Sequence, residues 1–187
     1  MEQASHPGAV WRTWANGLTL LRALLALPTA FWILHGDLLP AAICFATAVI
    51  TDALDGPLAR RLGQASPVGG LFDHATDALF VTAVLTAAAI DGRVVWVLPV
   101  IVPLAFLQYV LDSFALQGRP LRANRLGRLN GIAYFLLAGA AVLLPLAAQD
   151  SPAFDTAATA ILHWASIVLV ATSVCSMIDR ARWRQTG

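Results

Sequence analysis

Six apolar runs, separated by short polar segments, constrain this chain more than any other feature. They lie near residues 18–34, 38–51, 79–90, 94–110, 132–148 and 157–177. Several of them approach the ~20 residues that an α-helix needs to cross a bilayer. Only 12% of the residues are charged, against roughly 25% in soluble domains. The pattern predicts an all-α membrane protein with six transmembrane helices in a single domain over residues 1–187.

An acid-rich segment joins the second and third apolar runs. It reads TDALDGPLARRLGQASPVGGLFDHATD over residues 51–77 and contains four aspartates, Asp52, Asp55, Asp73 and Asp77. Both runs reach the length of a membrane span only by including part of this segment. We therefore expect the first two aspartates at the end of the second helix and the other two at the start of the third.

The arginines predict the orientation of the chain, because all twelve basic residues are Arg. Eleven of them fall at the amino end, between helices two and three, between helices four and five, or after helix six; only Arg93 falls on the other side. Since cytoplasmic loops of membrane proteins are enriched in basic residues, both termini and the acidic segment are expected in the cytoplasm.

The amino-terminal segment 1–15 carries Trp11 and Trp14 around Arg12. This pattern suits a short interfacial helix, although a polar terminus with aromatic anchors explains it equally well. No signal peptide is recognisable, so the first helix is expected to be retained. Cys44 and Cys175 lie in apolar runs without a CxxC motif and are expected to be packing residues. We expect membrane lipids, and no nucleic acid, among the partners.

The spacing of the aspartates predicts a metal site. Asp52 and Asp55 are three residues apart, and Asp73 and Asp77 are four apart, so each pair shares a helical face. The short connection makes the two helices antiparallel neighbours, which brings the pairs together. Clustered carboxylates repel unless they are protonated or bind cations, and such oxygen ligands suit Mg²⁺ or Mn²⁺. Two such ions would suit in-line phosphoryl displacement.

Residues between the two acid pairs are suited to a diphosphate. Gly56 and Ala59 are small and permit close approach of a ligand or helix, and Arg60 carries a guanidinium that can bind phosphate. Ser66 and Gly69 add a hydroxyl and backbone donors nearby. In an alternative interpretation the glycines only pack helices and Arg60 only reflects orientation.

The order Asp52-x2-Asp55-Gly56-x2-Ala59-Arg60-x8-Gly69-x3-Asp73-x3-Asp77 resembles the signature of the CDP-alcohol phosphatidyltransferase family at every fixed position. The resemblance implies six transmembrane helices, usually a homodimer, and CDP-diacylglycerol with a small alcohol as substrates. It also implies that the four aspartates hold two divalent metal ions and that Asp77 is the base, while CMP departs. By the same resemblance, Gly56, Arg60 and Ser66 contact CDP, Ala59 makes room for it, and Gly69 belongs to the same site.

Two further segments bear on the acceptor alcohol. The stretch NGLTLLR, which ends at Arg22, is similar to the N-x-L-T-x-x-R segment of phosphatidylglycerophosphate synthases and eukaryote-type cardiolipin synthases. Arg22 is expected either to reach the cytoplasmic interface or to face the site, where it would bind an acceptor or lipid phosphate. A basic cluster resembles the stretch after the fourth helix in that subgroup and consists of Arg119, Arg122, Arg125 and Arg128. These arginines suit an anionic acceptor such as glycerol 3-phosphate, or they only set orientation and attract anionic lipid.

Some features depart from that subgroup and leave alternatives open. The chain has DHATDALF around Asp77, without the lysine that commonly follows, and Pro57 interrupts the motif. His74 either adjusts acceptor choice or points away from the site. Alternatives within the family are transfer from CDP-choline or CDP-ethanolamine to diacylglycerol, and cardiolipin synthesis. Alternatives outside the family are an intramembrane prenyltransferase and a cation-binding transporter.

Overall fold

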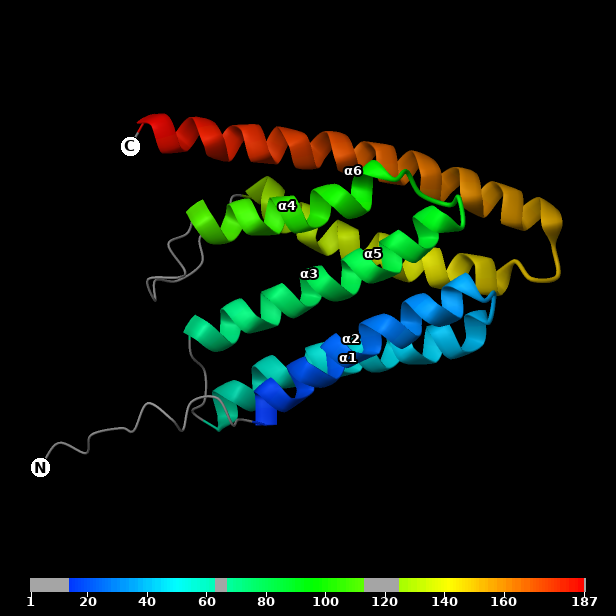
Figure 1. Ribbon diagram of the computed structural model, residues 1–187, viewed down its shortest axis with the longest axis horizontal. Coiled ribbons are helices and arrows are strands. Elements are labelled where there is room, and N and C mark those ends of the chain that lie inside the picture. Colours follow the sequence, from blue (N-terminus) through cyan, green and yellow to red (C-terminus); the bar gives the residue numbers. More distant parts are fainter. Residues whose placement is uncertain (1–13, 63–66, 113–124, 187) are drawn as a thin grey trace, which may run out of the picture.

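The chain folds as a bundle of six helices in the ranges that the computed structural model describes, residues 14–62, 67–112 and 125–186 (Figure 1). In chain order they are α1 (Trp14–Leu34), α2 (Leu38–Arg61), α3 (Pro67–Ile90), α4 (Val97–Asp112), α5 (Arg125–Ala147) and α6 (Pro152–Thr186). These ranges contain no strand. The predicted all-α class with six helices is confirmed. The predicted interfacial helix falls almost entirely on residues 1–13, which lie outside the described ranges.

The outward faces of the helices are apolar, as lipid contact requires. Five of the six described helices are long and apolar enough to cross a membrane, and α4 is a shorter apolar helix of 16 residues. Leucines that a soluble protein would bury point outward, and Leu27 of α1 is 77% exposed. Together these helices indicate an integral membrane protein.

Tight turns at one end of the bundle hold successive helices antiparallel. The helices α1 and α3 both end in a Schellman motif, in which Gly36 and Gly92 adopt φ values of 77° and 75°. The next amides, of Asp37 and Arg93, donate hydrogen bonds to the carbonyl oxygens of Trp32 and Ala88. Glycine adopts this left-handed conformation without the penalty that a Cβ would impose.

The helix α3 lies centrally and contacts α1, α4 and α5, while α1 also packs against α2. Fully buried alanines allow the helices to approach closely, and they include Ala41, Ala48, Ala88 and Ala138. Three aromatic rings join α2, α3 and α5, because Phe45 lies 5.6 Å from Phe80 and 5.5 Å from Phe135 between ring centroids.

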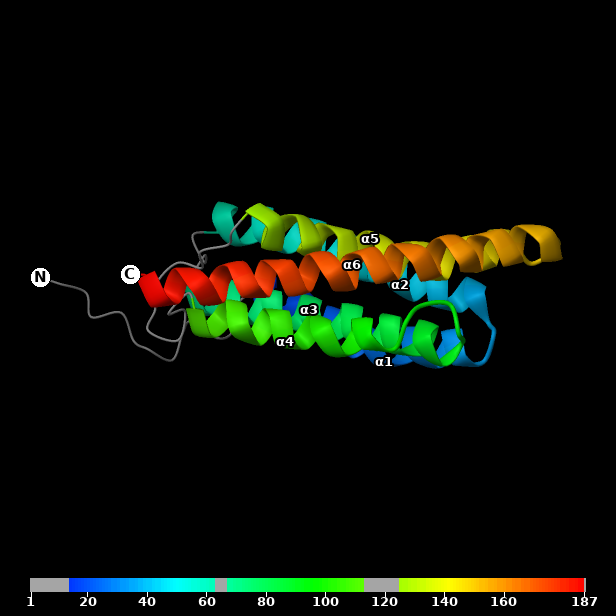
Figure 2. The same ribbon diagram turned by 90° about the horizontal axis from the view of Figure 1, so that it is seen from above.

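Six helix ends meet at one end of the bundle, at the left of Figures 1 and 2. They are the starts of α1, α3 and α5 and the ends of α2, α4 and α6. The acidic segment therefore lies at this end, where α2 finishes and α3 begins. The opposite end carries the two glycine turns and Arg93.

Candidate functional site

Four carboxylates from two helices converge on one arginine from a third. Arg22 lies in the third turn of α1 and is fully buried. Its Nη2 atom pairs with the α2 aspartates, 2.9 Å from Asp52 Oδ1 and 2.5 Å from Asp55 Oδ2. Its Nη1 atom pairs with the α3 aspartates, 2.9 Å from Asp73 Oδ1 and also with Asp77 Oδ1. The guanidinium thus bridges all four acids, with one terminal nitrogen for each helix.

Burial differs among the four carboxylates. The Asp55 side chain is 8% exposed and also accepts a hydrogen bond of 3.4 Å from the Thr19 hydroxyl. The side chains of Asp52, Asp73 and Asp77 are 42%, 28% and 31% exposed, so they are accessible from outside the bundle. One positive charge cannot balance four negative charges. The cluster therefore either takes up protons or attracts further cations.

The donor atoms present fit divalent metal ions. Two groups of side chains each bring ligand atoms within 4.8 Å of one another. One group is Asp52, Asp55 and Asp73, and the other is Asp73, His74 and Asp77. Carboxylate oxygens are the ligands that Mg²⁺ and Mn²⁺ prefer, and Asp73 belongs to both groups, as a carboxylate between two ions would.

Three residues expected to contact CDP follow Asp55 on α2 within about one and a half turns. They are Gly56, Ala59 and Arg60, and the Arg60 guanidinium folds back so that Nη1 would lie 3.5 Å from a Cβ at Gly56. Gly69 lies one turn before Asp73 at the start of α3. Ser66 and the side chain of Ala59 are outside the described part of the structure. The described residues Gly56, Arg60 and Gly69 are close in sequence to the aspartates of the acid cluster.

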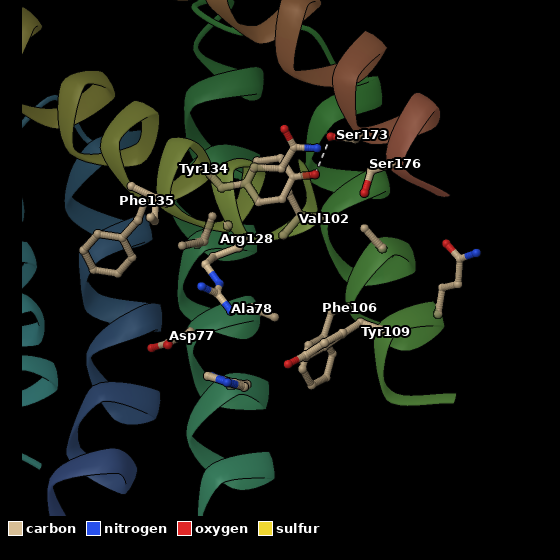
Figure 3. A pocket seen from close by; sticks show the side chains of 18 of the residues that line it. Asp77, Ala78, Val102, Phe106, Tyr109, Arg128, Tyr134, Phe135, Ser173 and Ser176 are labelled. Carbon is tan, nitrogen blue, oxygen red and sulfur yellow. Dashed lines mark hydrogen bonds between the residues drawn. The ribbon is translucent and has the colours of Figure 1, made fainter. Parts of the chain in front are cut away.

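A cavity of about 730 Å³ opens beside the acid cluster, between α3, α4, α5 and α6 (Figure 3). Its volume is in the range of small-molecule sites. Its charged and polar lining residues are Asp52, His74, Asp77, Gln108, Tyr109, Arg128, Asn130, Tyr134, Ser173, Ser176 and Arg180. The cavity therefore brings two of the four aspartates together with two arginines.

Several of these lining residues contact one another. The Arg180 guanidinium lies 4.9 Å from the centroid of the Tyr109 ring, which suits a cation-π contact. The His74 ring also lies near this tyrosine, at 6.2 Å between centroids, and it lines the cavity. The hydroxyls of Tyr134 and Ser173 share a hydrogen bond, drawn in Figure 3. The side chain of His74 thus faces the cavity rather than away from it.

The predicted acceptor arginines are only partly brought together. Arg128 lines the cavity, Arg125 is exposed at the start of α5, and Arg119 and Arg122 lie outside the described residues. Sequence reasoning used Arg180 only to set orientation and missed its place in the cavity. The available signal was a set of polar residues within or beside apolar runs. Asn130 and Tyr134 are four residues apart, Ser173 and Ser176 are three apart, and Gln108 and Tyr109 are adjacent.

A match to a known protein family takes in the acid cluster and the part of the cavity lining that precedes residue 173. Residues 12–172 match the family described as CDP-alcohol phosphatidyltransferase. A CDP-diacylglycerol--glycerol-3-phosphate 3-phosphatidyltransferase of Mycoplasma genitalium is 37% identical, with 42% of each chain covered. An archaetidylinositol phosphate synthase of Pyrococcus horikoshii is 35% identical, with 43% of each chain covered.

These curated relatives are matched over about two fifths of their length. The family match is broader, since it spans α1 to α5 and most of α6, and it includes Arg22, all four aspartates and Arg128. The family resemblance that the aspartate motif suggested is thus confirmed, and it extends over most of the chain. The chain belongs to the CDP-alcohol phosphatidyltransferase family.

Proposed function

We propose that this protein transfers a phosphatidyl group from CDP-diacylglycerol to a small polar alcohol, with glycerol 3-phosphate favoured. An acceptor hydroxyl oxygen would attack the phosphorus that bears the diacylglycerol. The new P–O bond forms as the anhydride bond to the other phosphorus breaks. CMP leaves with the electron pair, and the hydroxyl proton goes to a carboxylate of the site.

One observation carries this proposal: the acid cluster and the arginine-lined cavity share two residues, Asp52 and Asp77. A diphosphate held at the carboxylates would therefore border an acceptor in the cavity. Asp77 is the candidate base by the family resemblance, and its position in both the cluster and the cavity is compatible with that role. Close placement of two reactants accounts for a large part of catalysis in such transfers.

Asp52, Asp55, Asp73 and Asp77 would hold two divalent ions, Mg²⁺ or Mn²⁺. Bound there, the ions would neutralise charge on the diphosphate and on the departing CMP. The protein supplies ligands from two antiparallel helices, and Asp55 fixes the buried end of the set through its contacts with Thr19 and Arg22.

The donor nucleotide would lie along the end of α2. We propose that Gly56, Ala59, Arg60, Ser66 and Gly69 form its site. Arg60 folds over Gly56, so a nucleotide can reach its guanidinium at the place where the backbone has no side chain. A guanidinium fork matches phosphate geometry.

The acceptor would occupy the cavity with its phosphate at Arg128 and Arg180. Two arginines beside a tyrosine and two serines suit a small polyol phosphate, and Arg119, Arg122 and Arg125 would add positive charge at the same end. The glycerol 3-phosphate acceptor is supported by the name of the Mycoplasma relative. The Pyrococcus relative, named for inositol phosphate, makes an inositol phosphate the second candidate.

We also propose a domain organisation, an oligomeric state and an orientation for the protein. Residues 1–187 would form one membrane domain, and the family resemblance favours a homodimer. The arginines of the described helix ends lie at the site end of the bundle, and this bias favours a cytoplasmic site with both termini on that side. They are Arg60, Arg61, Arg125, Arg128, Arg180 and Arg182.

The test is CMP release from CDP-diacylglycerol by the purified protein with Mg²⁺. Acceptors offered singly would be glycerol 3-phosphate, an inositol phosphate, serine and phosphatidylglycerol. We expect turnover with one phosphate-bearing acceptor and loss of turnover in Asp77→Asn. The matched control is Asp150→Asn, an exposed aspartate between α5 and α6, which should retain turnover.

Other products would contradict the proposal in distinct ways. Turnover only with CDP-choline or CDP-ethanolamine and diacylglycerol would reverse the donor assignment. Pyrophosphate in place of CMP would indicate a prenyltransferase. Ion flux in vesicles without a nucleotide-dependent lipid product would indicate a transporter.

A further inference from the structure

Arg22 occupies the place where the oxygens of all four aspartates meet. Its two terminal nitrogens contact Asp52 Oδ1, Asp55 Oδ2, Asp73 Oδ1 and Asp77 Oδ1. These oxygens point toward a common centre. A cation bound by both acid pairs would lie beside the same four carboxylates, so its positive charge would compete with that of the guanidinium for them.

The positive charge of Arg22 is stabilised by the surrounding carboxylates, but not all of its N–H donors have a hydrogen-bond partner among the described residues. The guanidinium contributes the one positive charge at the centre of four negative ones, and arginine cannot release its proton to relieve a clash with a metal ion. Its Nε atom is buried without a hydrogen-bond partner among the described residues, which is unfavourable. A side chain held this way stabilises the cluster and can still be displaced by a cation of higher charge.

We propose that Arg22 is an internal counterion that holds the four aspartates together and competes with divalent cations for their oxygens. This inference rests on the proposal that the aspartates bind metal. It gives Arg22 a positioning role: the arginine keeps the ligands of α2 and α3 close together until cations replace it. Without a counterion the four carboxylates would repel one another and separate the two helices.

The test measures metal binding and thermal stability, without any turnover. Mn²⁺ binding to the full chain in detergent would be followed by electron paramagnetic resonance, and Tm by thermal unfolding in EDTA and in Mn²⁺. We expect Arg22→Gln to bind Mn²⁺ about tenfold more tightly or better, because a neighbouring positive charge is removed. We also expect its Tm in EDTA to fall below that of the wild type, and Mn²⁺ to raise its Tm by more.

Two further variants separate this role from general damage. Arg93→Gln is the matched control, because Arg93 also pairs with two aspartates, Asp91 and Asp155, at the opposite end of the bundle. It should lower Tm equally with and without Mn²⁺ and leave Mn²⁺ affinity unchanged. Arg22→Lys keeps the charge but has a single ammonium group, so its Mn²⁺ affinity should lie between those of the wild type and Arg22→Gln.

Each outcome has one meaning. Unchanged or weaker Mn²⁺ binding in Arg22→Gln would overturn the competition, and an unchanged Tm in EDTA would overturn the holding role. If Arg22→Gln folds only with Mn²⁺ present, the proposal is supported. If it does not fold in either condition, Arg22→Lys decides, and Mn²⁺ binding no tighter than wild type would overturn the competition. Absence of Mn²⁺ binding in the wild type and in both Arg22 variants would instead refute the metal site itself.

Discussion

Asp55 is the most buried of the four carboxylates, with 8% of its side chain exposed. It contacts both Arg22 and Thr19 of α1, whereas the other three acids are each more open. One oxygen of this residue, Oδ2, contacts both of these side chains of the first helix. At the residue scale, the geometry of the site depends on side chains such as Asp55, which contacts two residues at once.

Asp55→Asn should lower both Mn²⁺ affinity and CMP release. Asparagine has a similar shape but lacks the charge, so we expect CMP release to fall about 100-fold, as when an electrostatic partner is removed from a reacting site. Mn²⁺ titration and steady-state CMP release are the measurements. Asp91→Asn, an exposed aspartate at the far end, should leave both unchanged. Equal CMP release in Asp55→Asn and the wild type would rule out a role for this carboxylate.

Arg180→Gln should weaken acceptor binding more than it slows turnover. The arginine lines the cavity and lies over the Tyr109 ring, and it has no part in the ion pairs that hold Arg22. We expect KM for glycerol 3-phosphate to rise about tenfold or more with kcat little changed, since a lost charge-assisted contact acts on binding. Kinetics at varied acceptor concentration measure this, with CDP-diacylglycerol KM as the internal control. An unchanged acceptor KM would place the phosphate elsewhere.

At the scale of helices, α2 packs mainly against α1 and also meets α5 at one close contact. Gly139 of α5 faces the Phe45 ring of α2, and this ring is itself confined by Phe80 and Phe135. The contact lies on the same helix as Asp52 and Asp55. Tight packing in the middle of α2 therefore helps to fix where its acidic end lies relative to α3.

Gly139→Ala should destabilise the bundle. The added Cβ would lie 3.1 Å and 3.2 Å from two atoms of the Phe45 ring, and the neighbouring rings leave little room for a shift. We expect a loss of about 1–3 kcal/mol in the free energy of unfolding, as for other overpacked cores. Gly131→Ala is the control on the same helix, because a Cβ there meets nothing within 4 Å. Unfolding in denaturing detergent should separate the two; equal stability would contradict the packing argument.

At the scale of the whole molecule, ion pairs join distant segments at both ends of the bundle. Arg22 links α1 to α2 and α3 at the site end, and Arg93 links the turn after α3 to the start of α6 at the other end. The Arg93 guanidinium contacts Asp155 Oδ1 at 2.7 Å and the Thr159 hydroxyl at 3.0 Å. Burial acts to lower the pKa of Arg93, but hydrogen bonds to Asp155 and Asp91 outweigh it and raise the pKa above its ordinary value. The Arg93 guanidinium therefore keeps its positive charge at all ordinary pH values.

Arg93→Gln should lower stability without changing catalysis. It removes the contacts that hold α6 to the turn before α4, and we expect a loss of about 1–2 kcal/mol in the free energy of unfolding. CMP release at a temperature well below Tm should be unchanged, because the site lies at the other end of the bundle. Reduced CMP release at low temperature with normal Tm would contradict this separation of roles.

Much of the fold and part of the candidate site could be predicted from the sequence. Hydropathy and turn residues locate the helices because the length and composition of each apolar run determine, without distant contacts, whether it can form a membrane-spanning helix. The spacing of Asp52, Asp55, Asp73 and Asp77 places both acid pairs at one end of two neighbouring helices, because helical periodicity acts within a few residues. The same motif is specific enough to identify the family. These features are local, so the sequence by itself determined them.

Other features were decided only by the tertiary structure. Arg22 is 30 residues or more from each aspartate that it contacts, and no local periodicity indicates which way its side chain turns within α1. The cavity likewise takes Tyr109, Arg128 and Arg180 from three different helices. Its shape depends on how each helix is rotated about its axis, which is set by packing against its neighbours. Packing of side chains far apart in the chain therefore decided where the counterion and the cavity lie.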